Sequence, residues 1–230
     1  MTSAVLSARS DAGGGLLLVA LDVDAERARA YIAPGQYVEV RTASARGFFV
    51  LASQIGETPW ELLVKNAGDA ADALVSLPFG STLEVKGPMG KGFAVARVDR
   101  PVVVAVVGSA LAVARPVLAT RIAEGVAENT FLFLGLRAPT DLPIADEVAA
   151  WSDQGVNVVL CLSRAELEHH PEVLPKAKRA MGYVQVAVAR AVEAGVLPPG
   201  ALAVVAGPDA MLADMRALSR TAPIEVVTNV

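Results

Sequence analysis

The chain has 230 residues, of which 53% are hydrophobic and 19% charged, and its formal net charge is −4. This composition supplies a large core and excludes an intrinsically disordered chain. A net negative charge without any basic run disfavours nucleic-acid binding. The longest apolar stretch, 101–114, is shorter than the ~20 residues that cross a bilayer. We therefore expect no membrane span. The N-terminal residues show no signal-peptide pattern, so we expect a cytoplasmic protein.

Cysteine and histidine are scarce. The single cysteine, Cys161, excludes an internal disulfide and also a self-contained iron–sulfur cluster, which needs about four thiolates. The only two histidines, His169 and His170, are adjacent, so on a helix they diverge by ~100° and do not form a chelating pair. We expect no metal site.

The first part of the chain consists of short alternating segments separated by Gly, Pro, Asp and Ser clusters. Segments of this length and spacing are typical of antiparallel strands in a barrel or sandwich. They cover 15–23, 36–42, 48–53, 60–65 and 81–86.

The second part alternates near-continuous apolar strands with helical patterns, which is typical of a parallel sheet covered by helices on both faces. The strands are expected at 101–107, 130–136, 156–162, 201–207 and 224–228. The sequence therefore predicts an α+β chain of two domains. An antiparallel β-barrel spans 1–97, and a doubly wound parallel α/β domain spans 98–230.

The first strand of the second part ends abruptly at Gly108 and passes into an alanine-rich helix. A strand, a tight turn and a helix start together present free backbone N–H groups to a nucleotide phosphate. Only one glycine is present, because Ala110 occupies the second position where close phosphate approach favours glycine. The turn indicates either a nucleotide pocket that has been altered or a plain strand-to-helix turn.

Four segments, with the order of the two domains, resemble the ferredoxin–NADP reductase superfamily in its single-chain flavin oxidoreductase form. They are P-G-Q-Y-V-E-V-R (34–41), K-G-P-M-G-K-G-F (86–93), L-G-L-R-A-P-T-D-L-P-I-A-D-E-V (134–148) and A-G-P-D-A-M (206–211). The resemblance covers 34–230. It implies FAD on the barrel and NADP or NAD on the α/β domain.

On the flavin side, the family uses R-x-Y-S/T, in which arginine holds the pyrophosphate and tyrosine stacks on the flavin. Aligned on the A-S that follows, this chain has Gly47, Phe49 and Val50 at the three defining positions. Arg46, one residue early, points to the opposite face of an ideal strand. An ordinary core strand is the alternative. The flavin contacts that the resemblance implies are Phe49, Val50, Ser53, Gly68, Gly87, Pro88, Met89 and Gly90.

On the nicotinamide side, the resemblance places Ser163 and Arg164 where NADPH-dependent relatives hold the 2′-phosphate. A solvent-exposed helix start is an equally good interpretation of these two residues. Ala206 replaces a cysteine that is often found beside the nicotinamide. Hydride transfer needs no protein nucleophile, so no catalytic residue is assigned. The nicotinamide contacts implied are Gly108, Ser109, Ala110, Arg137, Ser163, Arg164, Tyr183, Gly207 and Pro208.

Two functions are compatible with these motifs. The first is a flavin-dependent NAD(P)H oxidoreductase that passes hydride to FAD and exchanges electrons with a separate redox protein as acceptor or donor. The second is a reductase-like subunit or interaction protein that is non-catalytic or keeps one cofactor. The second is compatible because several family positions, Gly47 and Ala110 among them, depart together, and fold alone does not imply function.

Overall fold

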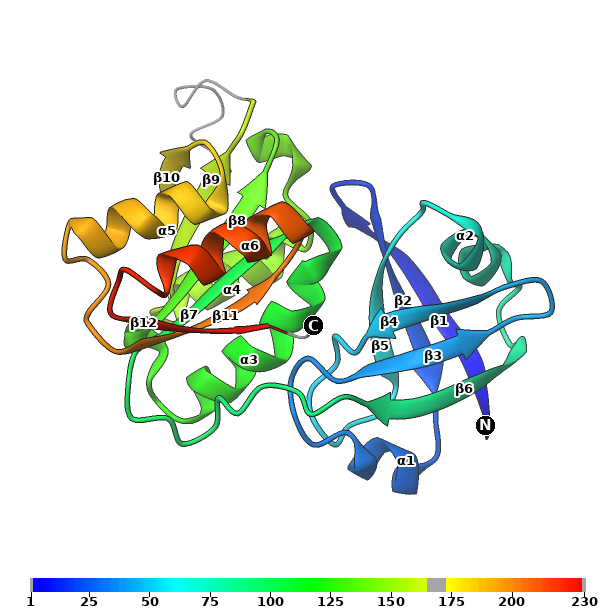
Figure 1. Ribbon diagram of the computed structural model, residues 1–230. Coiled ribbons are helices and arrows are strands. Elements are labelled where there is room, and N and C mark those ends of the chain that lie inside the picture. Colours follow the sequence, from blue (N-terminus) through cyan, green and yellow to red (C-terminus); the bar gives the residue numbers. More distant parts are fainter. Residues whose placement is uncertain (1, 165–172, 229–230) are drawn as a thin grey trace.

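The computed structural model describes residues 2–164 and 173–228, which form two six-stranded sheets lying side by side (Figure 1). The first sheet is antiparallel with the order β4-β3-β6-β1-β2-β5, and a single bridge between Leu51 and Leu62 links its two ends. The second is parallel with the order β10-β9-β8-β7-β11-β12. The predicted fold class, a barrel followed by a doubly wound α/β unit, is confirmed.

The first sheet alternates buried and exposed side chains, as a half-buried antiparallel sheet requires. In β6, for example, Leu83 and Val85 are buried while Glu84 and Lys86 are exposed. Its elements are β1 (Thr2–Gly13), β2 (Leu16–Asp22), α1 (Ala25–Ala30), β3 (Tyr37–Arg41), β4 (Arg46–Val50), β5 (Trp60–Lys65), α2 (Asp69–Ser76) and β6 (Thr82–Met89).

The second sheet is buried on both faces. In its central strand β7, Val104 belongs to the cluster that packs on α3 and α4, whereas Val103 belongs to the cluster that packs on α5 and α6. Its strands are β7 (Val102–Val107), β8 (Thr130–Leu136), β9 (Asn157–Leu162), β10 (Lys178–Met181), β11 (Ala201–Ala206) and β12 (Ile224–Thr228). Its helices are η1 (Gly108–Ala110), α3 (Leu111–Ala123), η2 (Ala127–Asn129), η3 (Pro139–Asp141), α4 (Ala145–Asp153), α5 (Val184–Glu193) and α6 (Asp209–Leu218).

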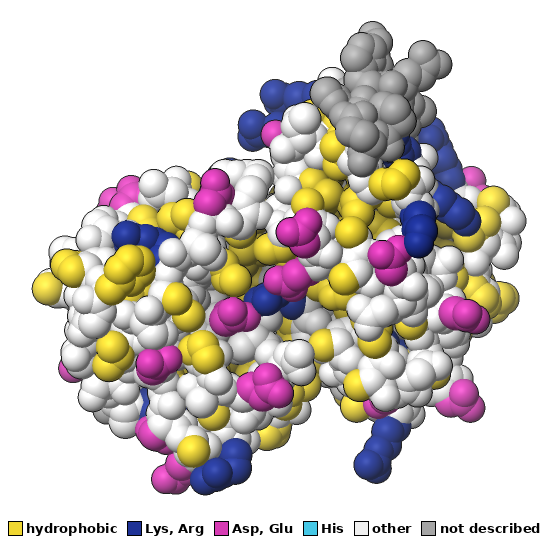
Figure 2. All heavy atoms as spheres, turned by 180° about the vertical axis from the view of Figure 1, so that it is seen from behind, with side chains coloured by type: hydrophobic (Ala, Val, Ile, Leu, Met, Phe, Trp, Pro, Cys, Tyr) yellow, Lys and Arg dark blue, Asp and Glu magenta, His cyan; other side chains and the backbone are white. Residues whose placement is uncertain are grey.

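The two sheets share part of one apolar core, because Leu16 and Leu63 of the first lie in the same cluster as Leu111 of the second. The β1–β2 hairpin approaches η3 so closely that a Cβ on Gly14, whose φ is +60°, would lie 2.3 Å from the Asp141 carbonyl oxygen. Seen from behind, the two parts meet along a hollow in which acidic, basic and apolar side chains gather (Figure 2).

The segment between β6 and β7 is fastened to the second sheet by Arg121 of α3, whose side chain is 1% exposed. Its guanidinium donates to the carbonyl oxygens of Val98 (2.8 Å) and Arg100 (3.2 Å). Burial lowers the pKa of Arg121, and the nearby carboxylate of Glu124 opposes that shift. The proposed domain boundary, between 97 and 98, lies in this segment. None of the described helices is long and apolar enough to cross a membrane.

Candidate functional site

A cleft of about 720 Å³ opens at the carboxyl ends of the second sheet. There β7 lies between β8, which follows it along the chain, and β11, which returns on its other side. Open α/β sheets bind ligands in the crevice at such a change of direction. The cleft brings together six residues predicted from the sequence, namely Gly108, Arg137, Ser163, Arg164, Tyr183 and Pro208.

Three predicted nicotinamide contacts, Ser109, Ala110 and Gly207, are not among the described residues that line the cleft. Ala110 packs against the apolar core instead. A Cβ on Gly207 would lie 3.0 Å from the sulfur of Met211, so that glycine lets α6 approach β11.

The cleft is cationic. Arg137 and Arg164 are exposed at the ends of β8 and β9, and the Arg164 N–H donates to the Arg137 carbonyl oxygen over 3.0 Å, which holds the two backbones together. Lys65 reaches the cleft from β5 of the first sheet, and Asp141 is the one carboxylate among the described lining residues. Three cations against one anion favour a ligand that carries phosphates.

Lys65, Gly135 and Cys161 are among the cleft residues that were not assigned to a site from the sequence. Lys65 is the last residue of the predicted strand 60–65, and the packing of the two sheets brings it to the cleft. A Cβ on Gly135 would lie 2.7 Å from Val107 Cγ2, so this glycine shapes the floor of the cleft. Cys161 is buried and also lines the cleft, and burial raises the pKa of its thiol to about 12.

In the first sheet, the register of β4 decides which aromatic ring is accessible. Phe49 pairs with the buried Val38 and packs against the barrel core, whereas Phe48 points outward and is 63% exposed. Successive side chains of a strand alternate between faces, so Arg46 lies on the outer face with Phe48. Phe49, the flavin contact predicted from the motif, thus lies on the inner face of β4, whereas an R-x-F pattern, 46–48, occupies the outer face.

The outer face also carries charge. Glu39 lies opposite Phe48 in the β3–β4 pair, and its carboxylate accepts a hydrogen bond from Arg41 Nε over 2.7 Å. That hydrogen bond, opposed by burial and assisted by the charges of Arg41, Arg46 and Lys86, lowers the pKa of Glu39. The face that carries the accessible ring therefore holds three cations, Arg41, Arg46 and Lys86, and two carboxylates, Glu39 and Glu84.

The predicted loop 87–90 lies along this face. Met89 pairs with Tyr37 of β3. A Cβ on Gly90, whose φ is +82°, would lie 3.0 Å from the Tyr37 ring, and Gln36 Nε2 donates to the Gly90 carbonyl oxygen over 3.0 Å. The described contacts thus bring the segment 87–90 beside Tyr37.

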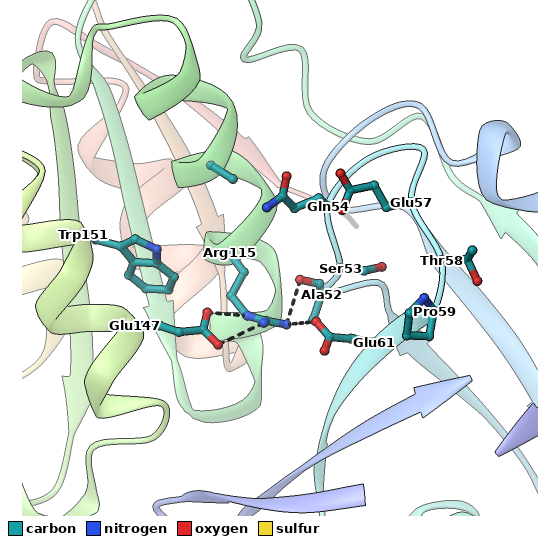
Figure 3. A pocket seen from close by; sticks show the side chains of 11 residues that line it. Ala52, Ser53, Gln54, Glu57, Thr58, Pro59, Glu61, Arg115, Glu147 and Trp151 are labelled. Atoms are coloured by element: carbon teal, nitrogen blue, oxygen red, sulfur yellow. Dashed lines mark hydrogen bonds and ion pairs between the residues drawn. The ribbon is translucent and has the colours of Figure 1, made fainter. Parts of the chain in front are cut away.

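Two other predicted flavin contacts lie elsewhere. Gly68 is the N-cap of α2, whose first turn carries Asp69 and Asp72. A Cβ on Gly47 would lie 2.6 Å from the Ala70 Cβ, so α2 fills the space where the aligned arginine would project. Ser53 is buried and lines a separate pocket of about 270 Å³ between the two sheets (Figure 3).

The predicted histidines, His169 and His170, lie outside the described residues. Among the residues that are described, no three His, Cys, Asp or Glu side chains gather in a way that could hold a metal ion.

The chain was compared with protein families, curated proteins and solved structures. No protein-family model and no curated protein matches the chain, but 157 chains of solved structures do. The cytochrome P450 reductase GcoB from Amycolatopsis is 24% identical with a TM-score of 0.78, over 97% of this chain and 68% of that chain. A ferredoxin NADP⁺ reductase from Neisseria gonorrhoeae, solved with bound FAD and NADP, is 14% identical with a TM-score of 0.76, over 100% of this chain and 98% of that chain.

The chain has the ferredoxin reductase fold. A third example is the ferredoxin reductase in carbazole 1,9a-dioxygenase, which is 20% identical with a TM-score of 0.73, over 99% of this chain and 69% of that chain. The resemblance inferred from the four motifs is thereby confirmed at the level of the fold.

Proposed function

We propose that this protein is a flavin-dependent NAD(P)H oxidoreductase that passes electrons to a separate redox protein. The observation that carries the proposal is the cationic cleft at the carboxyl ends of β7, β8 and β9, into which Lys65 and Leu16 of the first sheet project. A dinucleotide held there would contact both sheets. The shared fold with reductases, one of them solved with bound FAD and NADP, supports this function.

For the dinucleotide, the exposed guanidinium groups of Arg137 and Arg164 supply paired donors that suit phosphate oxygens. Neither is paired with a carboxylate among the described residues. The Ser163 hydroxyl, which donates to the Leu136 carbonyl oxygen over 3.3 Å, lies beside Arg164 and completes a 2′-phosphate site. Tyr183, 65% exposed, offers a ring face to a base. Gly108 and Pro208 line the turns over which the diphosphate would pass.

For the flavin, we assign the stacking ring to Phe48 and a phosphate contact to Arg46, with the loop 87–90 and the backbone of Val50 along the ring edge. Phe48 is exposed beside Tyr37, which suits a planar ligand. No flavin contact is assigned to Phe49, Ser53 or Gly68, because each points away from this face or lies beside acidic groups. When bound, a flavin accepts hydride, a proton with two electrons, from the nicotinamide and releases the electrons singly or together.

The contribution of the chain itself is positional. Hydride transfer needs the donor carbon and the acceptor nitrogen held together in a site that excludes water. Leu16, Leu63 and Leu111 belong to one core cluster, against which Val50 at the end of β4 packs, so the first sheet and the start of α3 share this core. No side chain is needed as nucleophile or base.

A second function, a reductase-like subunit that lacks one cofactor, is favoured by one observation. The first turn of α2 carries Asp69 and Asp72, and Ala70 closes the space beside Gly47. A carboxylate at a helix N-terminus stabilises that end of the helix but repels phosphate. The N-terminus of α2 therefore does not bind a diphosphate, and Arg46 is the cation that would bind it instead.

The visible spectrum of the purified protein separates the two functions. We expect a flavin absorption band, directly or after incubation with FAD or FMN, that bleaches when NADPH or NADH is added without oxygen. A protein that takes up neither flavin contradicts the first function. A bound flavin that neither dinucleotide reduces indicates the subunit that keeps one cofactor.

A further inference from the structure

Arg115 of α3 joins the two sheets at the base of the hollow between them (Figure 3). Its Nε donates to Glu147 Oε2 over 2.8 Å and its Nη2 to Glu147 Oε1 over 3.0 Å, in the bidentate geometry of a strong arginine–carboxylate pair. Its Nη1 crosses to the first sheet, where it donates to Glu61 Oε2 over 2.8 Å and to the Ala52 carbonyl oxygen over 3.1 Å. One guanidinium thus binds three parts of the chain: β5, the residue Ala52 just after β4, and α4.

This contact is shielded from water more than an ordinary surface ion pair. The side chain of Arg115 is 14% exposed, and those of Glu61 and Glu147 are 27% and 38% exposed. Burial alone would lower the pKa of Arg115, but the hydrogen bonds and charges of Glu147 and Glu61 outweigh it and raise the pKa. The cation therefore lies between the carboxylate of Glu61 on β5 and that of Glu147 on α4.

The strand that Arg115 binds reaches the cleft, and the helix that carries Arg115 begins just after a cleft residue. Glu61 and Lys65 both lie on β5, and Lys65 lines the cleft. Gly108, also in the lining, begins the turn that leads into α3, so it lies about 10 Å along the helix axis from Arg115 at 1.5 Å per residue. The bond between Arg115 and Glu61 therefore fixes the position of β5 against α3 from outside the cleft.

We propose that Arg115 is a positioning residue, which sets the separation between the flavin face of the first sheet and the dinucleotide cleft of the second. It contacts neither ligand. The proposal rests on the proposed oxidoreductase function. Because a misplacement of about 1 Å between reacting groups can slow a reaction about 100-fold, a tie of this kind controls rate more than affinity.

The physical consequence of removing the guanidinium is specific. In Arg115→Met, Glu61 and Glu147 face each other across the hollow without the cation between them, and their repulsion moves β5 away from α4. Adding Glu61→Gln and Glu147→Gln removes that repulsion and leaves a neutral contact. Arg115→Lys keeps the charge but lacks the planar fork, so it tests the geometry alone. Lys176→Met is the matched control, since it removes an exposed pair with Asp153.

The first measurement needs no cofactor. Spin labels at Ser76→Cys on α2 and Glu193→Cys on α5, both exposed positions, report the separation of the two sheets by pulsed electron resonance. Cys161 is buried and stays unlabelled. We expect a broader distance distribution in Arg115→Met, a narrower one again in the neutral triple variant, and no change in Lys176→Met.

The second measurement uses protein loaded with FAD and saturating NADPH in a stopped-flow experiment. We expect flavin reduction to slow on the order of 10-fold to 100-fold in Arg115→Met and less in Arg115→Lys. In steady-state turnover over a series of NADPH concentrations, we expect a lower kcat with an unchanged KM, and FAD affinity should stay within about twofold of wild type. Unchanged rates in both variants, or a changed distance with an unchanged rate, overturn the positioning role. A wild-type protein that neither NADPH nor NADH reduces overturns the proposed function and this role with it.

Discussion

The rings of Tyr37 and Phe48 meet edge to face across β3 and β4, with centroids 6.0 Å apart and planes at 77°. Only Phe48 of the two consecutive phenylalanines takes part, because Phe49 turns into the barrel. The pair therefore identifies the ring that is free to stack on a ligand, and it places Arg46 on the same side of the strand.

The first prediction separates the two phenylalanines. Phe48→Ala should weaken FAD binding about 10-fold, because ring stacking is worth on the order of 1 kcal/mol beyond buried area. Phe49→Ala should lower the free energy of unfolding by about 2–4 kcal/mol, since it leaves a cavity in a partly buried site, and leave FAD affinity of the folded protein unchanged. FAD fluorescence titration and urea unfolding measure the two effects. Weaker FAD binding by Phe49→Ala with unchanged binding by Phe48→Ala would instead support stacking of Phe49 on the flavin, as the motif predicts.

The second prediction concerns the position where the motif alignment expects arginine. Gly47→Arg should destabilise the protein by about 1–3 kcal/mol, because a Cβ there lies 2.6 Å from the Ala70 Cβ. It should not tighten FAD binding. Arg46→Ala is the comparison: we expect weaker FAD binding at unchanged stability. Tighter binding by Gly47→Arg would show that α2 moves aside and that the alignment on 47 holds.

The third prediction addresses the choice of dinucleotide. Arg164→Ala should weaken NADPH binding about 10-fold more than NADH binding, because a charge-assisted hydrogen bond to the extra phosphate contributes roughly 1.5–3 kcal/mol. Arg137→Ala and Lys65→Met, which remove cations elsewhere in the cleft, should weaken both dinucleotides alike. Calorimetric titration of the four proteins with each dinucleotide measures this. Equal losses for NADPH and NADH in Arg164→Ala would exclude a 2′-phosphate contact.

The fourth prediction is a pH effect on stability from Cys161. Burial raises the pKa of its thiol from 9.0 to about 12, so above pH 9 the unfolded chain loses this proton while the folded protein keeps it. The free energy of unfolding should therefore fall between pH 9 and about 12, by up to about 1.4 kcal/mol per pH unit from this group.

Cys161→Ala isolates that contribution, because it lacks the titrating thiol. Urea unfolding of both proteins at pH 8, 9.5 and 10.5 should show a shallower decline for the variant. Burial also raises the pKa of Tyr31, and Arg115 opposes that shift; Tyr31 is present in both proteins, so its effect cancels in the difference. Parallel declines would mean that water reaches the thiol through the cleft.

The sequence alone determined the fold. Before about residue 100, apolar residues alternate with polar ones, which is typical of a half-buried antiparallel sheet; after it, apolar strands alternate with helices, which is typical of a parallel sheet covered on both faces. It also determined the residues at the carboxyl ends of the parallel strands, such as Arg137 and Arg164, since strand direction places them at one edge.

Only the tertiary structure decided the rest. The face on which Phe48 and Phe49 point depends on pairing with β3, because a shift of one residue exchanges the two faces of a strand. The presence of Lys65 in the cleft and of Arg115 between Glu61 and Glu147 depends on how the two sheets dock. Those contacts join residues far apart in the chain, and no local pattern in the sequence encodes such a distance.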